Sequence, residues 1–258
     1  MAADAQAAAA PAAAAVSAAS ETTGKKGKRW FPLESNPDVM NTYCAKLGLP
    51  TDKLSWVDVL SVEDWALGMV PQPVKAVVLL FPIKDKTEEA RKAQAEKIKA
   101  EGQEVDGTLY FTKQTVGNAC GTVGILHSVA NASSQTGGDV DLPADGWFAK
   151  FVERTLPMDA DARAVALEDD QEIEESHEET AQQGQSEVTQ DVMTHFVAFV
   201  HRGGSLYELD GRKEFPINHG PTTSETLLAD AAAAIKTHFI DADPGEMRFT
   251  ITALAGSA

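Results

Sequence analysis

The stretch THFVAFVHRGGSLYELDGRKEFPI, residues 194–217, decides the fold class of this chain. Two runs rich in β-branched and aromatic residues flank Gly203 and Gly204. A two-residue glycine turn between such runs is typical of a β-hairpin, because glycine adopts the positive φ angles that these turns require. The stretch therefore predicts two antiparallel strands joined by a tight turn.

The register of this hairpin brings a carboxylate close to a histidine. If Arg202 pairs with Ser205 across the turn, Asp210 lies opposite Val197. His195 precedes Val197 by two residues and therefore shares its face of the strand. Diagonal neighbours on one face lie roughly 7–8 Å apart, which is close enough for their side chains to meet. Local geometry thus predicts a pair between His195 and Asp210.

Other interpretations of the same residues remain open at this point. Asp210 followed by Gly211 is also a turn signal. His201 can lie on the same face as His195, and His219 follows in a loop. The spacing alone does not choose the functional histidine among the three.

The stretch QTVGNACGTVG, residues 114–124, contains one of the two cysteines of the chain. A free cysteine is most often a small buried residue without chemistry. Asn118, however, is a candidate N-cap, which places Cys120 in the first turn of a helix. Backbone N–H groups and the helix dipole stabilise a thiolate at that position. The buried stripe of this predicted helix recurs at spacings of three and four, at Val123, Leu126, His127 and Ala130.

Four residues occur in an order that suits cysteine catalysis. This chemistry needs a thiolate, a base, a group that orients the base, and donors for the tetrahedral oxyanion. Cys120, His195 and Asp210 can fill the first three roles, and the amide of Gln114, six residues before the cysteine, can supply a donor. His127 lies about two helical turns from Cys120, too far to act as its base, and is expected to be a packed or partly exposed helix residue.

Other segments predict the scaffold around these residues. Ser35 or Asn36 before Pro37 predicts the start of a helix that Gly48 ends. Cys44 lies on this helix and is expected in the core. The apolar run AVVLLFPI, residues 76–83, predicts a buried central strand, and residues 87–102 predict a charged helix with a solvated face.

Length and composition indicate one folded domain. A chain of 258 residues that is 43% hydrophobic can bury a fairly large core, and we expect one domain over residues 29–258. Residues 1–28 are rich in alanine and have no aromatic residue, so we expect a disordered tail there. Two cysteines and no apolar run of about 18 residues favour free thiols and no membrane span. We therefore expect a soluble, cytoplasmic protein.

The charge of the chain constrains its partners. The formal net charge of −17 argues against nucleic acid, because phosphate binding needs clustered lysine and arginine. Many of the acidic residues lie in residues 168–187, a polar segment with few core-forming residues. Composition favours an acidic linker, but a long loop inside a domain is often a lid over a functional site. We expect residues 168–187 to be a loop that ends shortly before His195.

Four stretches of the sequence carry a resemblance to a known family. They are RWFPLESNPDV (29–39), FTKQTVGNACGTVGILHSVAN (111–131), THFVAFVHRGGSLYELDGRKEFPINHG (194–220) and SETLLADA (224–231). Together they resemble the ubiquitin carboxyl-terminal hydrolases, peptidase family C12, and in particular the short single-domain members of this family of deubiquitinating cysteine proteases. The resemblance runs from about Arg29 to the C-terminus.

This resemblance implies roles for individual residues. It implies that Cys120 is the nucleophile, His195 the general base, Asp210 its orienting partner and Gln114 the oxyanion donor. It also implies an α/β/α fold of the papain-like cysteine protease superfamily, with a central, mostly antiparallel sheet flanked by helices. No metal or organic cofactor is implied.

The resemblance also implies a substrate. Acidic residues at the positions of Glu34, Asp38 and Asp58 face arginines in the C-terminal tail of ubiquitin, and residues 168–187 cross over the cleft. We expect hydrolysis of small adducts or short peptides from ubiquitin, with a related ubiquitin-like modifier as a further candidate, and a monomeric enzyme. The alternative is a protein that binds and stabilises free ubiquitin with little turnover.

Overall fold

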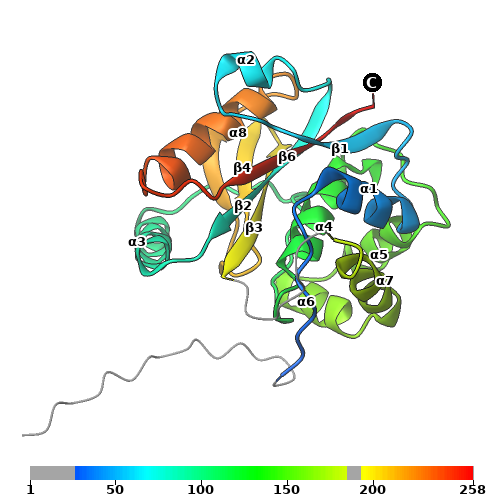
Figure 1. The fold of residues 1–258 in the computed structure, drawn as a ribbon. Helices are drawn as coiled ribbons and strands as arrows, with labels where there is room; N and C mark the ends of the chain where they lie inside the picture. Colours follow the sequence, from blue (N-terminus) through cyan, green and yellow to red (C-terminus); the bar gives the residue numbers. More distant parts are fainter. Residues whose placement is uncertain (1–26, 185–192, 258) are drawn as a thin grey trace, which may run out of the picture.

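A six-stranded sheet forms the centre of the protein (Figure 1). A computed structural model describes residues 27–184 and 193–257. The strand order is β1-β6-β2-β3-β4-β5, and every neighbouring pair is antiparallel. The strands are β1 (Leu54–Asp58), β2 (Val74–Pro82), β3 (Thr194–Arg202), β4 (Ser205–Leu209), β5 (Ile217–Pro221) and β6 (Thr250–Gly256).

Helices cover both faces of this sheet, as Figure 1 shows. One face carries α1 (Pro37–Lys46), α4 (Cys120–Ala132), the 3₁₀ turn Ser134–Thr136, α5 (Trp147–Thr155), α6 (Ala160–Glu168) and α7 (Gln171–Ala181). The other face carries α2 (Asp64–Leu67), α8 (Leu227–Ile235) and the π-helical turn Lys236–Ile240. The remaining helix, α3 (Asp85–Glu101), lies beside the sheet. The α/β/α fold expected from the resemblance is confirmed.

The central strand β2 divides the core into two layers. Ala76 and Val78 pack with the helices on the α4 side, whereas Val77 and Leu79 pack with those on the α8 side. Both faces of the strand are therefore buried, which explains why its sequence is a continuous apolar run rather than an alternating one. The prediction of a buried strand at residues 76–83 is confirmed apart from its last residue.

The hairpin of β3 and β4 has the predicted register. Arg202 pairs with Ser205, and the ladder runs to the pair Ala198 and Leu209. Gly203 and Gly204 form the turn with φ angles of 55° and 79°. Two positive φ angles match the right-handed twist of the flanking strands, which is why glycine occupies both positions.

Helix α1 also begins and ends where the sequence predicts. The Asn36 side chain caps it by accepting a hydrogen bond of 2.9 Å from the Asp38 N–H. Gly48, two residues after the helix, has a φ of 92°, which ends the helical path. Cys44 is fully buried in the core, as expected.

The predicted acidic loop over residues 168–187 is wrong for much of its length. Residues Gln171–Ala181 form helix α7, and the Asp170 side chain caps it by accepting a hydrogen bond from the Ile173 N–H. Its buried stripe consists of Ile173, His177, Thr180 and Ala181. The spacing of this stripe is helical, but three of its four residues are only weakly apolar, which hid the pattern in the sequence.

Two expectations fall outside the residues that the structure describes. The disordered tail was expected over residues 1–28, of which 1–26 are not described, and the last part of the acidic segment falls within 185–192. Across residues 27–184 and 193–257, none of the helices combines the length and the apolarity of a membrane span.

Candidate active site

The hairpin register joins His195 and Asp210 at one end of the sheet. Nε2 of His195 lies 2.6 Å from Oδ1 of Asp210, and both residues are 2% exposed. The backbone N–H of Arg212 donates a second hydrogen bond of 2.8 Å to the same carboxylate oxygen. Burial alone would raise the pKa of Asp210, but the charge and hydrogen bond of His195 lower it well below its usual range.

This carboxylate favours the protonated form of the imidazole. Burial lowers the pKa of His195, but the charge of Asp210 and its hydrogen bond outweigh that effect and raise the pKa to about 9. A hydrogen bond with the Cys120 thiol contributes in the same direction. Since Nε2 is bonded to Asp210, Nδ1 is the ring nitrogen left for the thiol.

Cys120 is the first residue of α4 and approaches His195 from the face of the sheet that α4 covers. It is 8% exposed. Burial would raise its pKa, but the hydrogen bond and charge of His195 together with the backbone N–H groups of Phe196 and Gly121 lower it. The lowered pKa of the thiol and the raised pKa of the imidazole both favour a thiolate–imidazolium pair.

The predicted N-cap of this helix is wrong. Asn118 has a φ of 60°, and its side-chain Nδ2 donates a hydrogen bond of 3.0 Å to the Trp30 carbonyl. The capping position is held by Ala119, which has no side chain to accept a hydrogen bond from the first turn. The N–H groups that an N-cap side chain would occupy are thereby left for a thiolate or for the oxygen of a reacting carbonyl.

An N-terminal segment, residues 28–33, supports the loop before Cys120. Trp30 N–H donates to the Gly117 carbonyl at 2.9 Å, and Gly117 N–H donates to the Lys28 carbonyl at 3.2 Å. Leu33 packs so closely that a Cβ added to Gly121 would lie 3.0 Å from the Leu33 Cβ. Gly121 therefore permits the N-terminal segment to press against the first turn of α4, a contact that the sequence analysis missed.

A buried polar chain, also missed, fixes α7 against α4. The hydroxyl of Thr122 lies 2.8 Å from the Tyr43 hydroxyl and 2.7 Å from Nδ1 of His177. The other ring nitrogen of His177 lies 2.5 Å from the Phe31 carbonyl. Burial lowers the pKa of His177 to about 4, so the ring is neutral and serves as a structural link.

Gln114 contacts the loop that follows Asp210. Its backbone N–H donates to the Gly211 carbonyl at 2.8 Å, and its side-chain Nε2 donates to the Val116 carbonyl at 3.0 Å. An amide nitrogen carries two hydrogens, so one donor is left after the bond to Val116. The side-chain oxygen of Gln114 is buried, and no donor in the described part of the chain bonds to it.

The remaining histidines have other partners. His127 is fully buried and stacked on Phe111, and burial lowers its pKa to about 4, so the expectation of a packed helix residue is confirmed. His201 is the second-last residue of β3, next to the hairpin turn. His219 contacts a second buried carboxylate, with its Nε2 2.8 Å from Oε2 of Glu208. Among the three candidates, His195 is thus the one bonded to Asp210.

The three acidic residues lie on neighbouring segments of the chain. Glu34 directly follows Leu33, and a Cβ added to Gly184 would lie 2.5 Å from its Oε2. Asp38 is exposed in the first turn of α1, and Asp58 is exposed at the end of β1. The two elements are tied by hydrogen bonds between Asn41 and Trp56. Among the described residues, no three metal-ligating side chains converge.

The geometry is that of a cysteine hydrolase, and comparison with known proteins identifies the family. Residues 30–241 match the sequence profile described as ubiquitin carboxyl-terminal hydrolase, family 1. The chain belongs to this family. The family resemblance drawn from the four sequence motifs is therefore confirmed.

Similar hydrolases occur in distant eukaryotes. The chain is 44% identical over 230 residues to a probable ubiquitin carboxyl-terminal hydrolase of Dictyostelium discoideum, covering 88% of each chain. It is 42% identical to ubiquitin carboxyl-terminal hydrolase 3 of Arabidopsis thaliana, covering 92% of this chain and 98% of the relative. It is also 42% identical to the human isozyme L1, covering 88% and 98%.

The fold is shared with more distant members of known structure. The catalytic domain of Trichinella spiralis UCH37, bound to ubiquitin vinyl methyl ester, superposes with a TM-score of 0.67 at 20% sequence identity. This match covers 90% of the present chain and 97% of the other. At this identity, the comparison supports the hydrolase fold.

Proposed function

We propose that this chain is a thiol hydrolase that removes small adducts or short peptides from the C-terminal glycine of ubiquitin. The observation that carries the proposal is the hydrogen-bonded series Cys120, His195 and Asp210, buried at the start of α4. The deubiquitinating activity follows from the family, and the roles of the individual residues are our assignment.

The reaction proceeds through an acyl-enzyme. The Cys120 thiolate attacks the carbonyl carbon of the terminal glycine, and the protonated His195 gives its proton to the departing amine or thiol. The resulting thioester is then attacked by water, from which His195 removes a proton. Asp210 holds the imidazole in orientation and stabilises its charged form in both half-reactions.

The oxyanion of each tetrahedral intermediate needs hydrogen-bond donors. We assign this role to the amide of Gln114 and to the uncapped first turn of α4. Gln114 retains one side-chain N–H beyond its bond to Val116, and its backbone is tied to Gly211 next to the catalytic carboxylate. Donors fixed before the reaction begins cost no reorganisation when the charge develops.

A covalent probe tests the assignment of the nucleophile. Ubiquitin carrying a C-terminal vinyl methyl ester is expected to form a 1:1 adduct at Cys120, located by peptide mass spectrometry. Cys120→Ala should abolish the adduct and the hydrolysis while it retains ubiquitin binding. Cys44→Ala is the matched control and should leave both nearly unchanged. Equal loss in the two variants would show a folding effect instead of chemistry.

A hydrolysis assay separates turnover from mere binding. A ubiquitin-binding protein with little turnover would bind ubiquitin with the same surface but would hydrolyse a fluorogenic C-terminal amide of ubiquitin hardly at all. The alignment of thiol, imidazole and carboxylate favours turnover. Tight binding together with a rate no faster than that of Cys120→Ala would establish the alternative.

We further propose that Glu34, Asp38 and Asp58 bind the basic C-terminal tail of ubiquitin. Two of them are exposed, and Glu34 adjoins the segment that packs on the catalytic helix. Exposed ion pairs are individually weak, so the effect belongs to the group and depends on salt. Reversing all three charges in the Cys120→Ala background should weaken ubiquitin binding, most strongly at low ionic strength. Unchanged affinity would refute the assignment.

The size of the leaving group is a separate proposal. Cys120 is only 8% exposed. The chain that follows α7 passes against Glu34 at Gly184, beside the segment that packs on the catalytic helix. We expect small amides and short peptides on ubiquitin to be cleaved at least tenfold faster than ubiquitin joined to a folded protein. Comparable kcat/KM values for the two substrates would contradict this restriction.

The remaining proposals concern partner range and setting. We propose a monomeric, cytoplasmic enzyme that also accepts a related ubiquitin-like modifier. Both cysteines are free thiols, which suits a reducing compartment. Light scattering gives the oligomeric state, fractionation of cells gives the compartment, and a ubiquitin-like modifier with a C-terminal electrophile tests the partner range. A dimer, a membrane-bound fraction or absence of labelling would contradict the respective part.

A further inference from the structure

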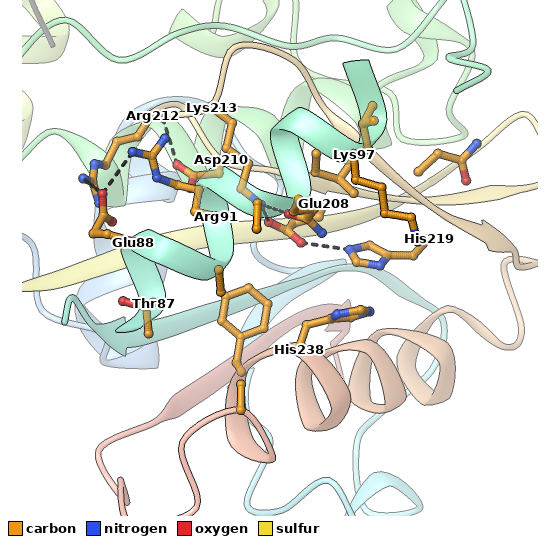
Figure 2. Close-up of a pocket in the computed structure, with 18 of the residues that line it drawn as sticks. Thr87, Glu88, Arg91, Lys97, Glu208, Asp210, Arg212, Lys213, His219 and His238 are labelled. Atoms are coloured by element: carbon orange, nitrogen blue, oxygen red, sulfur yellow. Dashed lines mark hydrogen bonds and ion pairs between the residues drawn. The ribbon is translucent and has the colours of Figure 1, made fainter. Parts of the chain in front are cut away.

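A cavity lies between α3 and the edge of the sheet (Figure 2). Its volume is about 690 Å³, within the range of small-molecule sites in proteins. Its walls include Phe81 from β2 and Phe239 from the π-helical turn, both on the α8 side of the sheet. Asp210 lines one wall, but Cys120, His195 and Gln114 do not line the cavity.

The cavity exists because α3 does not pack on the sheet. None of the 17 residues of α3 is buried. Polar contacts hold the helix instead: Lys84 lies 2.6 Å from Asp243 at the start, Lys213 donates to Gln94 at 2.8 Å in the middle, and Lys99 lies 2.8 Å from Glu214 near the end. Long polar side chains leave part of the space between the helix and the sheet unfilled.

Apolar side chains line much of this space. Phe81 and Phe239 meet edge to face with ring centroids 5.0 Å apart. Ile217 from β5 and Ile98 from α3 complete an apolar surface on two further sides. Flat apolar ligands gain most from such walls, because their burial removes apolar area from water on both faces.

The carboxylates that line the cavity are already paired. Arg212 donates two hydrogen bonds of 3.0 Å to Glu88, and Glu208 contacts both Lys213 and His219 (Figure 2). Asp210 is bonded to the catalytic histidine. The remaining lining carboxylate, that of Glu101, lies 3.9 Å from Nζ of Lys97. A cationic ligand would therefore have to displace an existing partner.

Donors, by contrast, are left over. Arg91 donates from Nη2 to Glu88 at 3.0 Å, but its Nε is buried and has no acceptor among the described residues. Lys97 is paired with Glu101 at 3.9 Å, a contact too long for a hydrogen bond, and its side chain is 70% exposed at the rim, so its ammonium N–H groups can also bind a ligand. An unpaired buried donor is costly, so an acceptor at this place would be favourable.

We propose that this cavity binds an organic anion with a flat apolar body. The rings of Phe81 and Phe239 and the two isoleucines would contact the body, Arg91 would bind the anionic group, and Lys97 at the rim would add charge attraction. Five cationic side chains and four carboxylates line the cavity, whereas the chain as a whole carries a net charge of −17, so the cavity is locally less repulsive to anions. The site is separate from the ubiquitin-binding residues assigned above.

A fluorescent probe tests the site independently of hydrolase activity. The probe is 1-anilinonaphthalene-8-sulfonate, an aromatic monoanion, and its control is the neutral N-phenyl-1-naphthylamine. We expect saturable binding to one site, with the anion bound at least tenfold more tightly than the neutral compound. Equal affinity of the two compounds, or binding of the anion at several equivalent sites, would overturn the proposal.

Two matched pairs of variants locate the site. Lys97→Glu should weaken binding of the anion at least fivefold, whereas Lys92→Glu makes the same charge change on α3 outside the cavity and should not. Ala93→Trp introduces bulk at the cavity wall and should reduce the affinity, whereas Ala100→Trp, on the same helix away from the cavity, should leave it within twofold. All four positions are exposed, so the fold should persist. Equal effects within either pair would place the probe elsewhere.

Discussion

Replacement of His195 by glutamine offers the sharpest test of the thiolate–imidazolium pair. In the wild-type protein, burial raises the pKa of Cys120 while the hydrogen bond and charge of His195 outweigh it, so that the pKa lies below its ordinary value of 9.0. His195→Gln removes the charge and leaves the burial. The midpoint for ionisation of Cys120 should therefore rise, although the backbone N–H groups of Phe196 and Gly121 continue to lower it.

Cys44 supplies an internal reference for the size of the effect. Burial raises its pKa to about 12, so at pH 7 about one molecule in 10⁵ carries the Cys44 thiolate, against about one in 10² for an ordinary thiol. The stronger nucleophilicity of the more basic thiolate recovers roughly a factor of 30 of this difference. Cys120 should thus react at least about 30-fold faster than Cys44, before its greater access is counted.

The assay is alkylation by iodoacetamide between pH 5 and pH 10, with each cysteine followed by peptide mass spectrometry. Near pH 6, each unit by which His195→Gln raises the pKa of Cys120 should slow its alkylation about threefold. The rate at Cys44 should not change, which controls for unfolding. An unchanged midpoint at Cys120, or alkylation of Cys44 at a similar rate in the wild type, would refute the reasoning.

Three further predictions concern the active site and stability. Asp210→Asn removes the charge that raises the pKa of His195, so the alkaline limb of the pH profile of kcat/KM should move from near pH 9 to lower pH by about two units, as measured with a fluorogenic ubiquitin amide. Gln114→Ala should lower kcat on the order of 10²–10³-fold with little change in ubiquitin affinity, and full activity would leave the oxyanion to backbone donors. The buried rings of His127 and His177 have pKa values of about 4, so the stability they confer is fully present above pH 6.5 and is lost as the pH falls toward 4. Urea unfolding should show a loss of about 2 kcal/mol per histidine between pH 7.5 and pH 5, and a flat profile would contradict their neutral burial.

Local patterns in the sequence were sufficient for the hairpin and its consequence. The glycine turn fixes the register, and the register alone brings His195 and Asp210 to the same end of the sheet. The approach of Cys120 to His195 is different, because it depends on how α4 packs across the sheet. The sequence order made that contact plausible, and the family resemblance, not periodicity, predicted it.

Features that depend on tertiary packing escaped the sequence analysis. Asn118 is a residue type that often caps helices, but its side chain bonds to the Trp30 carbonyl and its backbone has a positive φ, so it does not cap α4. In α7, His177 and Thr180 occupy buried positions that periodicity assigns to larger apolar residues. The cavity beside α3 arises from polar contacts between residues far apart in the chain, which no local pattern reveals.

The hydrogen bonds between Lys28, Trp30 and Gly117 have a practical consequence for protein engineering. They attach residues 28–30 to Gly117, which precedes the nucleophile Cys120 by three residues. A purification tag or fluorescent label fused at Gly27 would start directly before the segment that supports the loop of the nucleophile. The C-terminal strand β6 instead ends beside β1 and β2, at Gly256, so a fusion placed there leaves that segment undisturbed.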